Sequence, residues 1–214
     1  MKKMLIGAFF IIVLSFIIGI ASYNSLPSTL ASHWGSNGNV NGYIPKFWAL
    51  FLLPLISLGM LLLFYFIPRI DPLKKNYEKF RKYFDSFIFV IILFLFYIYL
   101  LTILWNFHVL FNMTTALIPA LGFLFIYIGA ILRNIKRNWF IGIRTPWTIS
   151  SDKVWDKTHR LGSILFQISG IIMILGIFFD DFIVYFILVP IIVSAVALVV
   201  YSYLEYRKLE KKKK

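Results

Sequence analysis

The chain has 214 residues, of which 60% are hydrophobic and 14% charged, and its formal net charge is +13. Soluble domains average about 25% charged residues, so this composition excludes an ordinary soluble protein. The chain has no cysteine, which excludes disulfides, thiolate catalysis and metal sites with cysteine ligands.

Six apolar runs predict six membrane-spanning helices, because each is close to the ~20 residues that a helix needs to cross the hydrocarbon core. The runs are Met4–Ala21, Phe47–Ile67, Phe84–Trp105, Thr114–Leu132, Gly162–Phe178 and Phe182–Tyr203. Lys2 and Lys3 precede the first run as in a signal peptide, but the run is long and no clear small-x-small cleavage site follows it. We expect this run to stay as the first span of an all-α integral membrane protein.

Basic residues predict the orientation of the chain. Of the 22 Lys and Arg, 21 lie at the N-terminus, in the second and fourth gaps between runs or in the tail, and the exception is Lys46. Because positive charge marks the cytoplasmic side, we expect a protein of the plasma membrane with both termini cytoplasmic. The charge is expected to attract anionic lipid. No docking motif for nucleic acid accompanies it, so we expect no direct nucleic-acid binding.

The first gap, Ser22–Lys46, is the long loop on the outside and is called the Asn-Gly loop below. It is rich in Asn, Gly, Ser and Pro and contains two Asn-Gly pairs, Asn37-Gly38 and Asn41-Gly42. Both residue types tolerate positive φ and favour tight turns. We therefore expect a small folded cap, with a plain polar connector as the alternative.

Three shorter gaps connect neighbouring spans. The second gap, Pro68–Tyr83, is basic, and its segment Asn76–Tyr83 is expected to form a short helix that runs into span three. The third gap, Asn106–Met113, is uncharged, and the fifth is only the turn around Asp180 and Asp181. These short outside turns predict two helical hairpins, one from spans three and four and one from spans five and six.

The fourth gap, Arg133–Leu161, is the long loop on the inside and is called the Arg–Trp loop below. It begins with a basic cluster and contains three tryptophans eight residues apart, Trp139, Trp147 and Trp155. Pro146 excludes a continuous helix through its middle. The tryptophans suit the membrane interface, with the ring inward and the N–H toward water.

A helix is expected to begin late in the Arg–Trp loop and to lead into span five. Ser150 or Ser151 can cap its start, and Asp152 in the first turn suits the helix dipole. One side of this helix is expected to face the protein, with Val154, Trp155, Thr158, His159 and Leu161. The opposite side is expected to face water, with Lys153, Asp156, Lys157 and Arg160. Such a helix is typical of the membrane interface.

Small residues recur at seven-residue intervals in spans four and five. Span four contains Gly122 and Gly129, and the other stripe consists of Gly162, Ser169 and Gly176. Such stripes let helices approach closely, so we interpret them as packing surfaces.

The spans contain no Asp, Glu, Lys or Arg away from their ends, and Gln167 is their most prominent polar side chain. A charge at membrane depth costs about 2.5–3.5 kcal/mol, so it is found where function needs it, as in ion and proton pathways. Without such a residue, ion-coupled transport is not expected. Outside, His33, His108, Asp180 and Asp181 are suitable zinc ligands but lack short ligand spacing. We expect loop packing there, with no metal and no other cofactor.

The Arg–Trp loop contains residue types for nucleophilic catalysis, with Ser150, Thr158 and His159 near Asp156. It has no nucleophile elbow or oxyanion signature, so we expect no enzyme activity. Arg144 can place its guanidinium near lipid phosphate, a helix C-terminus or a carboxylate such as Asp152 or Asp156. The loop can dock a partner protein, and the alternative is an interfacial anchor that positions span five.

Two stretches resemble the SdpI family of membrane proteins. The Arg–Trp loop resembles the family's signature loop at Gly142, Arg144, Thr145, Pro146, Trp147, Thr148, Ser151, Trp155, Lys157, Thr158, His159 and Arg160. The Asn-Gly loop resembles, more loosely, a small N-terminal domain often found with this family, at Pro27, His33, Trp34, Gly38, Gly42, Tyr43 and Lys46. On this resemblance we divide the chain into residues 1–67, with the first two spans, and residues 68–214, with the SdpI-like four-span region.

The resemblance implies immunity to a membrane-active toxic peptide, with sensing of it. In the founding system the membrane protein both protects the cell and holds a transcriptional repressor at the membrane. The expectation is that the Asn-Gly loop meets the peptide outside and the Arg–Trp loop docks a repressor inside. The alternatives are an uncoupled permease or lipid-handling protein, and a membrane scaffold. The sequence names no toxin, repressor or oligomeric state.

Overall fold

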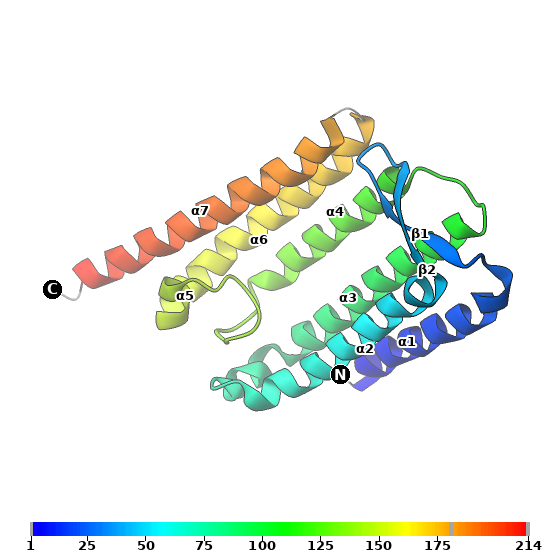
Figure 1. Cartoon of the computed structure of the whole chain (residues 1–214). Helices are drawn as coiled ribbons and strands as arrows, with labels where there is room; N and C mark the ends of the chain where they lie inside the picture. Colours follow the sequence, from blue (N-terminus) through cyan, green and yellow to red (C-terminus); the bar gives the residue numbers. More distant parts are fainter. Residues whose placement is uncertain (1, 180–181, 213–214) are drawn as a thin grey trace. The chain divides into compact units, whose positions relative to one another are not determined.

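The computed structural model describes residues 2–179 and 182–212 and is mostly helical (Figure 1). In chain order the elements are α1 (Lys2–Ser22), η1 (Tyr23–Ser25), β1 (Thr29–Trp34), β2 (Val40–Pro45), α2 (Lys46–Ile70), η2 (Lys74–Asn76), α3 (Tyr77–Asn106), α4 (Met113–Leu132), α5 (Pro146–Ser150), α6 (Asp152–Leu175), η3 (Gly176–Phe178) and α7 (Ile183–Lys211). Among the described residues, six helices are long and apolar enough to cross a membrane. The predicted six-span helical fold is confirmed.

Several helices continue past the apolar runs into polar residues, whose backbone groups stay in the helical hydrogen-bond pattern. The segment predicted as a short helix before span three is the first part of α3, which has a non-helical residue at Phe80. α6 runs without interruption from Asp152 into the fifth span. Asp180 and Asp181, in the predicted turn between the last two spans, lie outside the described residues.

The Asn-Gly loop contains a two-stranded antiparallel sheet, which the all-α prediction did not include. β1 pairs with β2 in the register Thr29↔Pro45, Leu30↔Ile44 and Ala31↔Tyr43, and irregularities follow toward Trp34↔Val40. The folded cap predicted for this loop is confirmed. Each strand has six residues, and an isolated hairpin of this size is marginal in water, so the sheet depends on packing against helices.

The chain divides into two compact units. Unit 1 comprises Met1–Tyr65 and Asp85–Ala120, and unit 2 comprises Phe66–Phe84 and Leu121–Lys214. α2, α3 and α4 each contribute residues to both units. The division at residue 67 follows the family resemblance and stays a prediction.

The core of unit 1 joins the hairpin to three helices. Its buried residues are Leu26, Leu30, Ala49, Leu50, Tyr99 and Ile103. The Tyr99 hydroxyl donates to the carbonyl of Ser15 at 3.0 Å, which links α3 to α1. The hairpin therefore lies on the ends of α1, α2 and α3.

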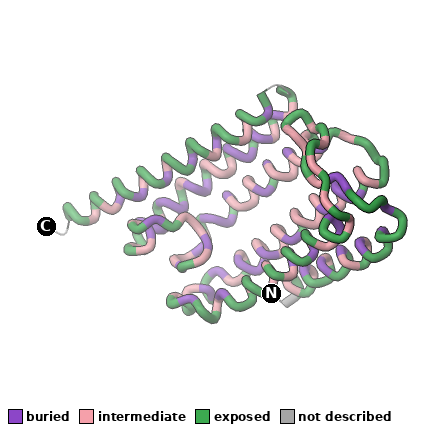
Figure 2. The backbone as a smooth tube through the Cα atoms, in the orientation of Figure 1, coloured by how far each residue is buried: buried purple, intermediate pink, exposed green. Residues whose placement is uncertain are grey.

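In unit 2, α6 and α7 lie side by side (Figure 1). Buried residues recur about every four positions along α7, at Pro190, Ser194, Leu198 and Ser202, and Figure 2 shows exposed turns between them. The exposed side of α7 is rich in valine and other apolar residues. In a membrane protein such an apolar outer face meets lipid.

Glycines bring α4 close to α6. A Cβ on Gly170 would lie 2.4 Å from the Gly122 carbonyl oxygen, and one on Gly129 would lie 2.8 Å from the Ser163 carbonyl oxygen. The packing role predicted for Gly122 and Gly129 is confirmed. The predicted stripe on the following span also packs: a Cβ on Gly176 would lie 2.6 Å from Cβ of Phe186, and Ser169 bonds to Ser194 of α7.

Candidate functional site

Thr145 starts α5 with a reciprocal capping arrangement. The Thr148 N–H donates to Thr145 Oγ1 at 3.2 Å, and the Thr145 N–H donates to Thr148 Oγ1 at 2.8 Å. Pro146 is the first helical residue, where its missing N–H costs nothing. Thr148 Oγ1 also donates to the Ile143 carbonyl at 2.8 Å. The Thr-Pro-Trp-Thr sequence thus fixes the middle of the Arg–Trp loop.

His159 holds the loop against α6. The Ile143 N–H donates to Nε2 of this buried ring at 3.1 Å, and Nδ1 lies 2.9 Å from the Trp155 carbonyl oxygen. An acceptor role for Nε2 requires a neutral ring with its proton on Nδ1. The Trp155 ring stacks on the His159 ring with centroids 4.1 Å apart.

Gly142 is required where the loop passes this pair of rings. Its φ is +109°, a conformation that side chains other than glycine rarely adopt. A Cβ there would lie 2.5 Å from His159 Nε2. Glycine therefore allows both the backbone conformation and the close approach to the imidazole.

Asn138 organises the start of the loop from a fully buried position. Its Oδ1 accepts from the N–H groups of Phe140 and Ile141 at 2.9 and 2.7 Å, and its Nδ2 donates to the Ile141 carbonyl at 2.9 Å. The Tyr77 hydroxyl oxygen lies 3.3 Å from the same Oδ1. Sequence reasoning assigned no role to Asn138 or to Tyr77.

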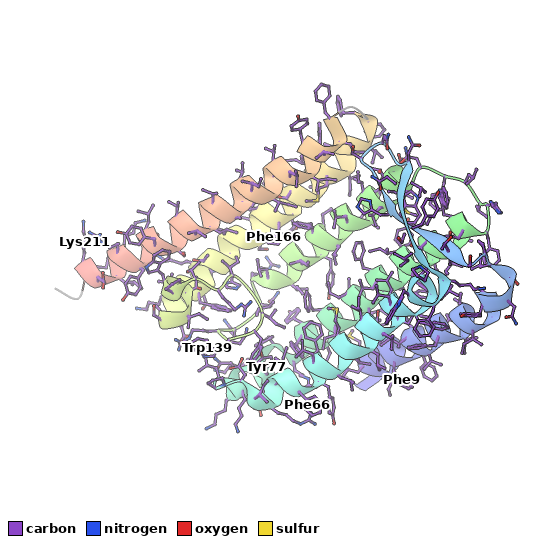
Figure 3. All side chains as sticks on the ribbon, in the orientation of Figure 1. Phe9, Phe66, Tyr77, Trp139, Phe166 and Lys211 are labelled. Atoms are coloured by element: carbon purple, nitrogen blue, oxygen red, sulfur yellow. The ribbon has the colours of Figure 1, made fainter. Side chains whose placement is uncertain are left out.

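Asp71 joins the loop to the connection between α2 and α3. This carboxylate is 2% exposed, and its Oδ2 accepts from the Trp139 N–H at 2.9 Å and from the Tyr77 hydroxyl at 3.1 Å. Oδ1 accepts from the Leu73 N–H at 2.6 Å. Figure 3 labels Tyr77 on α3 and Trp139 in the loop. In the sequence, Asp71 differs from its surroundings only as an acidic residue in the basic second gap, Pro68–Tyr83.

Other cations of the loop pair with the two carboxylates that were expected for Arg144. Arg137 pairs with Asp152 at 2.7 Å, and Lys136 pairs with Asp156 at 3.3 Å. The exposed Arg144 instead donates from Nη1 to the Trp139 carbonyl at 2.7 Å. The two carboxylates proposed for Arg144 are therefore occupied by cations that precede it in the loop.

The expected faces of the helix after the loop are confirmed for seven of the nine residues named, while Asp156 and Leu161 are both half-buried. Ser151 caps α6 by accepting from the Val154 N–H at 3.4 Å. Val154, Trp155, Thr158 and His159 are buried, whereas Lys153, Lys157 and Arg160 are exposed. Lys157 bonds to Glu205 of α7, which also accepts from Lys208 at 2.8 Å.

The three tryptophans do not share one environment. Trp155 is fully buried and its Nε1 donates to the Ile135 carbonyl at 2.8 Å, so the prediction that its N–H points toward water is wrong. Trp147 is half-buried, with its ring centroid 5.1 Å from that of Tyr203. Trp139 is 49% exposed. Their regular spacing carried no information about these differences.

In the Asn-Gly loop, one of the two Asn-Gly pairs forms the turn. Gly38 has a φ of +77° and donates its N–H to the Gly35 carbonyl at 2.9 Å. Asn112 Nδ2 donates to the Asn37 carbonyl at 3.4 Å. The second pair lies within β2, where Gly42 pairs with His33, so the turn predicted there is wrong.

Asn106 holds β1 on the end of α3. The Ala31 N–H donates to Asn106 Oδ1 at 2.9 Å, and Asn106 Nδ2 donates to the Ala31 carbonyl at 3.0 Å. The amide thus bonds the strand as a neighbouring strand would. Trp34, at the end of β1, lies edge-on to Trp105 with ring centroids 5.7 Å apart. Sequence reasoning did not connect these residues.

The other predicted residues of this loop lie on its surface or at its base. His33 is exposed and its Nδ1 contacts Asn41 Oδ1, and Tyr43 is 64% exposed. Pro27 is exposed next to the buried Leu26. Lys46 begins α2, donates to the Leu26 carbonyl at 2.9 Å and lies over the Tyr23 ring.

Across residues 2–179 and 182–212, no group of three or more His, Asp or Glu side chains could hold a metal ion. His33 and His108 are both exposed. Asp180 and Asp181, the other two residues weighed as zinc ligands, lie outside the described residues.

Comparison with known proteins finds a match for each of the two loops. Residues 134–202 match the model of the SdpI/YfhL protein family, and residues 10–58 match a domain of unknown function, DUF1648. The Immunity protein SdpI of Bacillus subtilis (strain 168) is 29% identical over 210 residues, which cover 98% of this chain and 98% of that protein. No solved structure matches the chain. The resemblance predicted from the sequence is therefore confirmed: residues 134–202 of this multi-pass membrane protein match the SdpI/YfhL family, and its whole length is similar to one immunity protein.

Proposed function

We propose that the protein protects its cell against a membrane-active toxic peptide, which it contacts with the Asn-Gly loop. In this proposal it lies in the plasma membrane with both termini cytoplasmic, and the Arg–Trp loop meets a soluble partner inside the cell. The observation that carries the proposal is the similarity to an immunity protein over 98% of the chain. That similarity spans both loops, so neither is an addition to an unrelated membrane protein.

The hairpin supplies a suitable contact surface for an amphipathic peptide. Tyr43 is 64% exposed on β2, and His33 is exposed on β1. At the start of α2, Phe47 and Trp48 are 49% and 50% exposed. The exposed aromatic side chains of the hairpin and of the start of α2 give a preformed surface, and aromatic residues dominate binding energy at protein interfaces.

A peptide challenge tests this function. Sensitive cells that express the chain are expected to survive a candidate secreted peptide that kills cells without it. Tyr43→Ser is expected to lower about tenfold the highest peptide concentration that the expressing cells survive, because it removes an exposed aromatic contact. Ser36→Ala, in the exposed turn of the same hairpin, serves as the matched control. Equal killing with and without the chain contradicts protection, and equal protection by both variants contradicts the hairpin contact.

The Arg–Trp loop offers a docking face for a repressor or other soluble protein. Its backbone is fixed by Asp71, Asn138 and His159, while the Trp139 ring and the Arg144 side chain remain exposed. A rigid aromatic and basic surface suits an acidic partner.

Trp139→Ala tests that docking face, because it removes the ring and keeps the backbone contacts to Asp71. A soluble partner that co-purifies with the wild-type chain is expected to be lost from this variant. Trp48→Ala is the control, since Trp48 is equally exposed but lies in the first turn of α2, away from the Arg–Trp loop. Loss from both variants, or retention by both, counts against docking at the Arg–Trp loop.

We propose that protection involves no catalysis. Both ring nitrogens of the buried His159 contact backbone groups, and the Ser150 hydroxyl donates to the Trp147 carbonyl at 3.1 Å. Neither arrangement supports the nucleophile and base pair that covalent catalysis uses. A toxic peptide incubated with the purified protein is expected to be recovered with unchanged mass, and a cleaved or modified peptide would contradict this.

A further inference from the structure

Unit 2 contains a cavity of about 280 Å³ between α4, α6, α7 and the Arg–Trp loop. Phe125 of α4 and Phe166 of α6 stack beside it with ring centroids 5.4 Å apart, and Leu198 of α7 also lines it. Sites for drug-sized molecules have volumes of roughly 300–1,000 Å³. This cavity is slightly smaller, so it suits a narrow ligand such as one hydrocarbon chain.

The hydroxyl groups in the cavity wall already have partners. Ser169 Oγ lies 3.0 Å from Ser194 Oγ and donates to the Pro190 carbonyl at 3.3 Å. Thr145 Oγ1 lies 3.0 Å from Ser202 Oγ. These groups therefore do not require a polar ligand, and apart from Arg144 the remaining side chains of the wall are apolar. An unbranched hydrocarbon fits such an interior without leaving a polar group unsatisfied.

Arg144 lines the same cavity and adds positive charge to it. A guanidinium has five N–H donors, and one nitrogen of Arg144 donates to the Trp139 carbonyl. The carboxylates of Asp152 and Asp156 are paired with Arg137 and Lys136. Arg144 therefore keeps donors for an incoming anion, in a geometry that matches phosphate.

We propose that this cavity binds one acyl chain of an anionic phospholipid, with the lipid phosphate at Arg144. The helices around it are membrane-spanning, so lipid is the ligand at highest concentration there. Exposed basic residues of the same segment, Lys153 and Arg160, attract anionic headgroups, and basic pockets between spanning helices are a recurrent form of lipid site. This site does not depend on the immunity function.

Native mass spectrometry of the full chain tests the site. The protein is released from nanodiscs that contain equal amounts of phosphatidylglycerol and phosphatidylcholine, and the retained lipids are counted. The wild-type chain is expected to retain phosphatidylglycerol in preference. Arg144→Gln should lower that preference about tenfold, the size of one charge-assisted hydrogen bond. Arg207→Gln, which alters an exposed arginine of α7 outside the cavity lining, should leave it unchanged.

A second pair of variants tests the acyl chain. Ala195→Phe fills the cavity and should reduce retention of both lipids, whereas Ala197→Phe, on the same helix but lining a separate shallow groove, should not. The proposal is overturned if the two arginine variants show equal headgroup preference, or if the two phenylalanine variants retain equal lipid. Displacement of the lipid by glycerol phosphate alone would also overturn it, since the anion would then bind without its chain.

Discussion

Asp71 shows how one side chain joins segments that are distant in sequence. Its carboxylate bonds Leu73, Tyr77 and Trp139, the last of them 68 positions away. Replacing a buried carboxylate that accepts several hydrogen bonds lowers the free energy of unfolding, because each buried donor is left without an acceptor. Asp71 is therefore as important for the shape of the Arg–Trp loop as the residues within that loop.

Asp71→Asn is expected to destabilise the folded protein by about 1–3 kcal/mol, because an amide replaces one accepting oxygen with a donor. The thermal unfolding midpoint in detergent measures the effect. The matched control is Asp152→Asn, since Asp152 also bonds a loop residue but its side chain is 72% exposed, and exposed pairs contribute about 0–1 kcal/mol. Equal shifts in the two variants would contradict the role given to Asp71.

Family resemblance identified Gly142 and His159 without giving a physical reason for either. The reason appears only when the loop folds back on α6, where the glycine at φ +109° lies against the imidazole. Asp71 and Asn138 belong to no motif, and their partners lie far away or on the backbone. Sequence patterns record periodicity and local spacing, so such contacts are not predictable from them.

At the scale of elements, the hairpin is positioned by one amide at the end of a spanning helix. Asn106 provides both an acceptor and a donor to Ala31. The strands are short and irregularly paired, so this support and the core around Leu30 decide whether the hairpin keeps its form.

Asn106→Ala is expected to speed hydrogen exchange at the Ala31 amide about tenfold, because that N–H loses its acceptor. Hydrogen exchange measured by mass spectrometry on peptides that cover β1 provides the readout. Asn39→Ala, in the exposed turn of the hairpin, should leave this rate unchanged. An unaffected Ala31 amide in the Asn106 variant would show that the sheet holds its position without α3.

The spanning helices were predictable from the sequence, whereas the hairpin strands were not. A spanning helix follows from a run of about 20 apolar residues, which is present in every case here. The strands are only six residues long, and β2 contains the Asn41-Gly42 pair that usually marks a turn. The Asn-Gly pair therefore predicted a turn at this position, whereas pairing with β1 makes it part of a strand.

At the scale of the whole molecule, charge asymmetry is the basis of the proposed orientation. Of 22 Lys and Arg, only Lys46 lies in the segments assigned to the outside. The hairpin can meet a secreted peptide only if it faces outward, and the Arg–Trp loop can meet a soluble partner only if it faces the cytoplasm. Both parts of the proposed function depend on this orientation.

The chain has no cysteine, so a single introduced thiol reports the side on which it lies. Ser36 and Ser150 are both exposed, one in the hairpin turn and the other at the end of α5. In intact cells, a membrane-impermeant maleimide is expected to label Ser36→Cys fully and to label Ser150→Cys only after permeabilisation. Labelling of Ser150→Cys in intact cells, with Ser36→Cys protected, would contradict the orientation and the roles assigned to both loops.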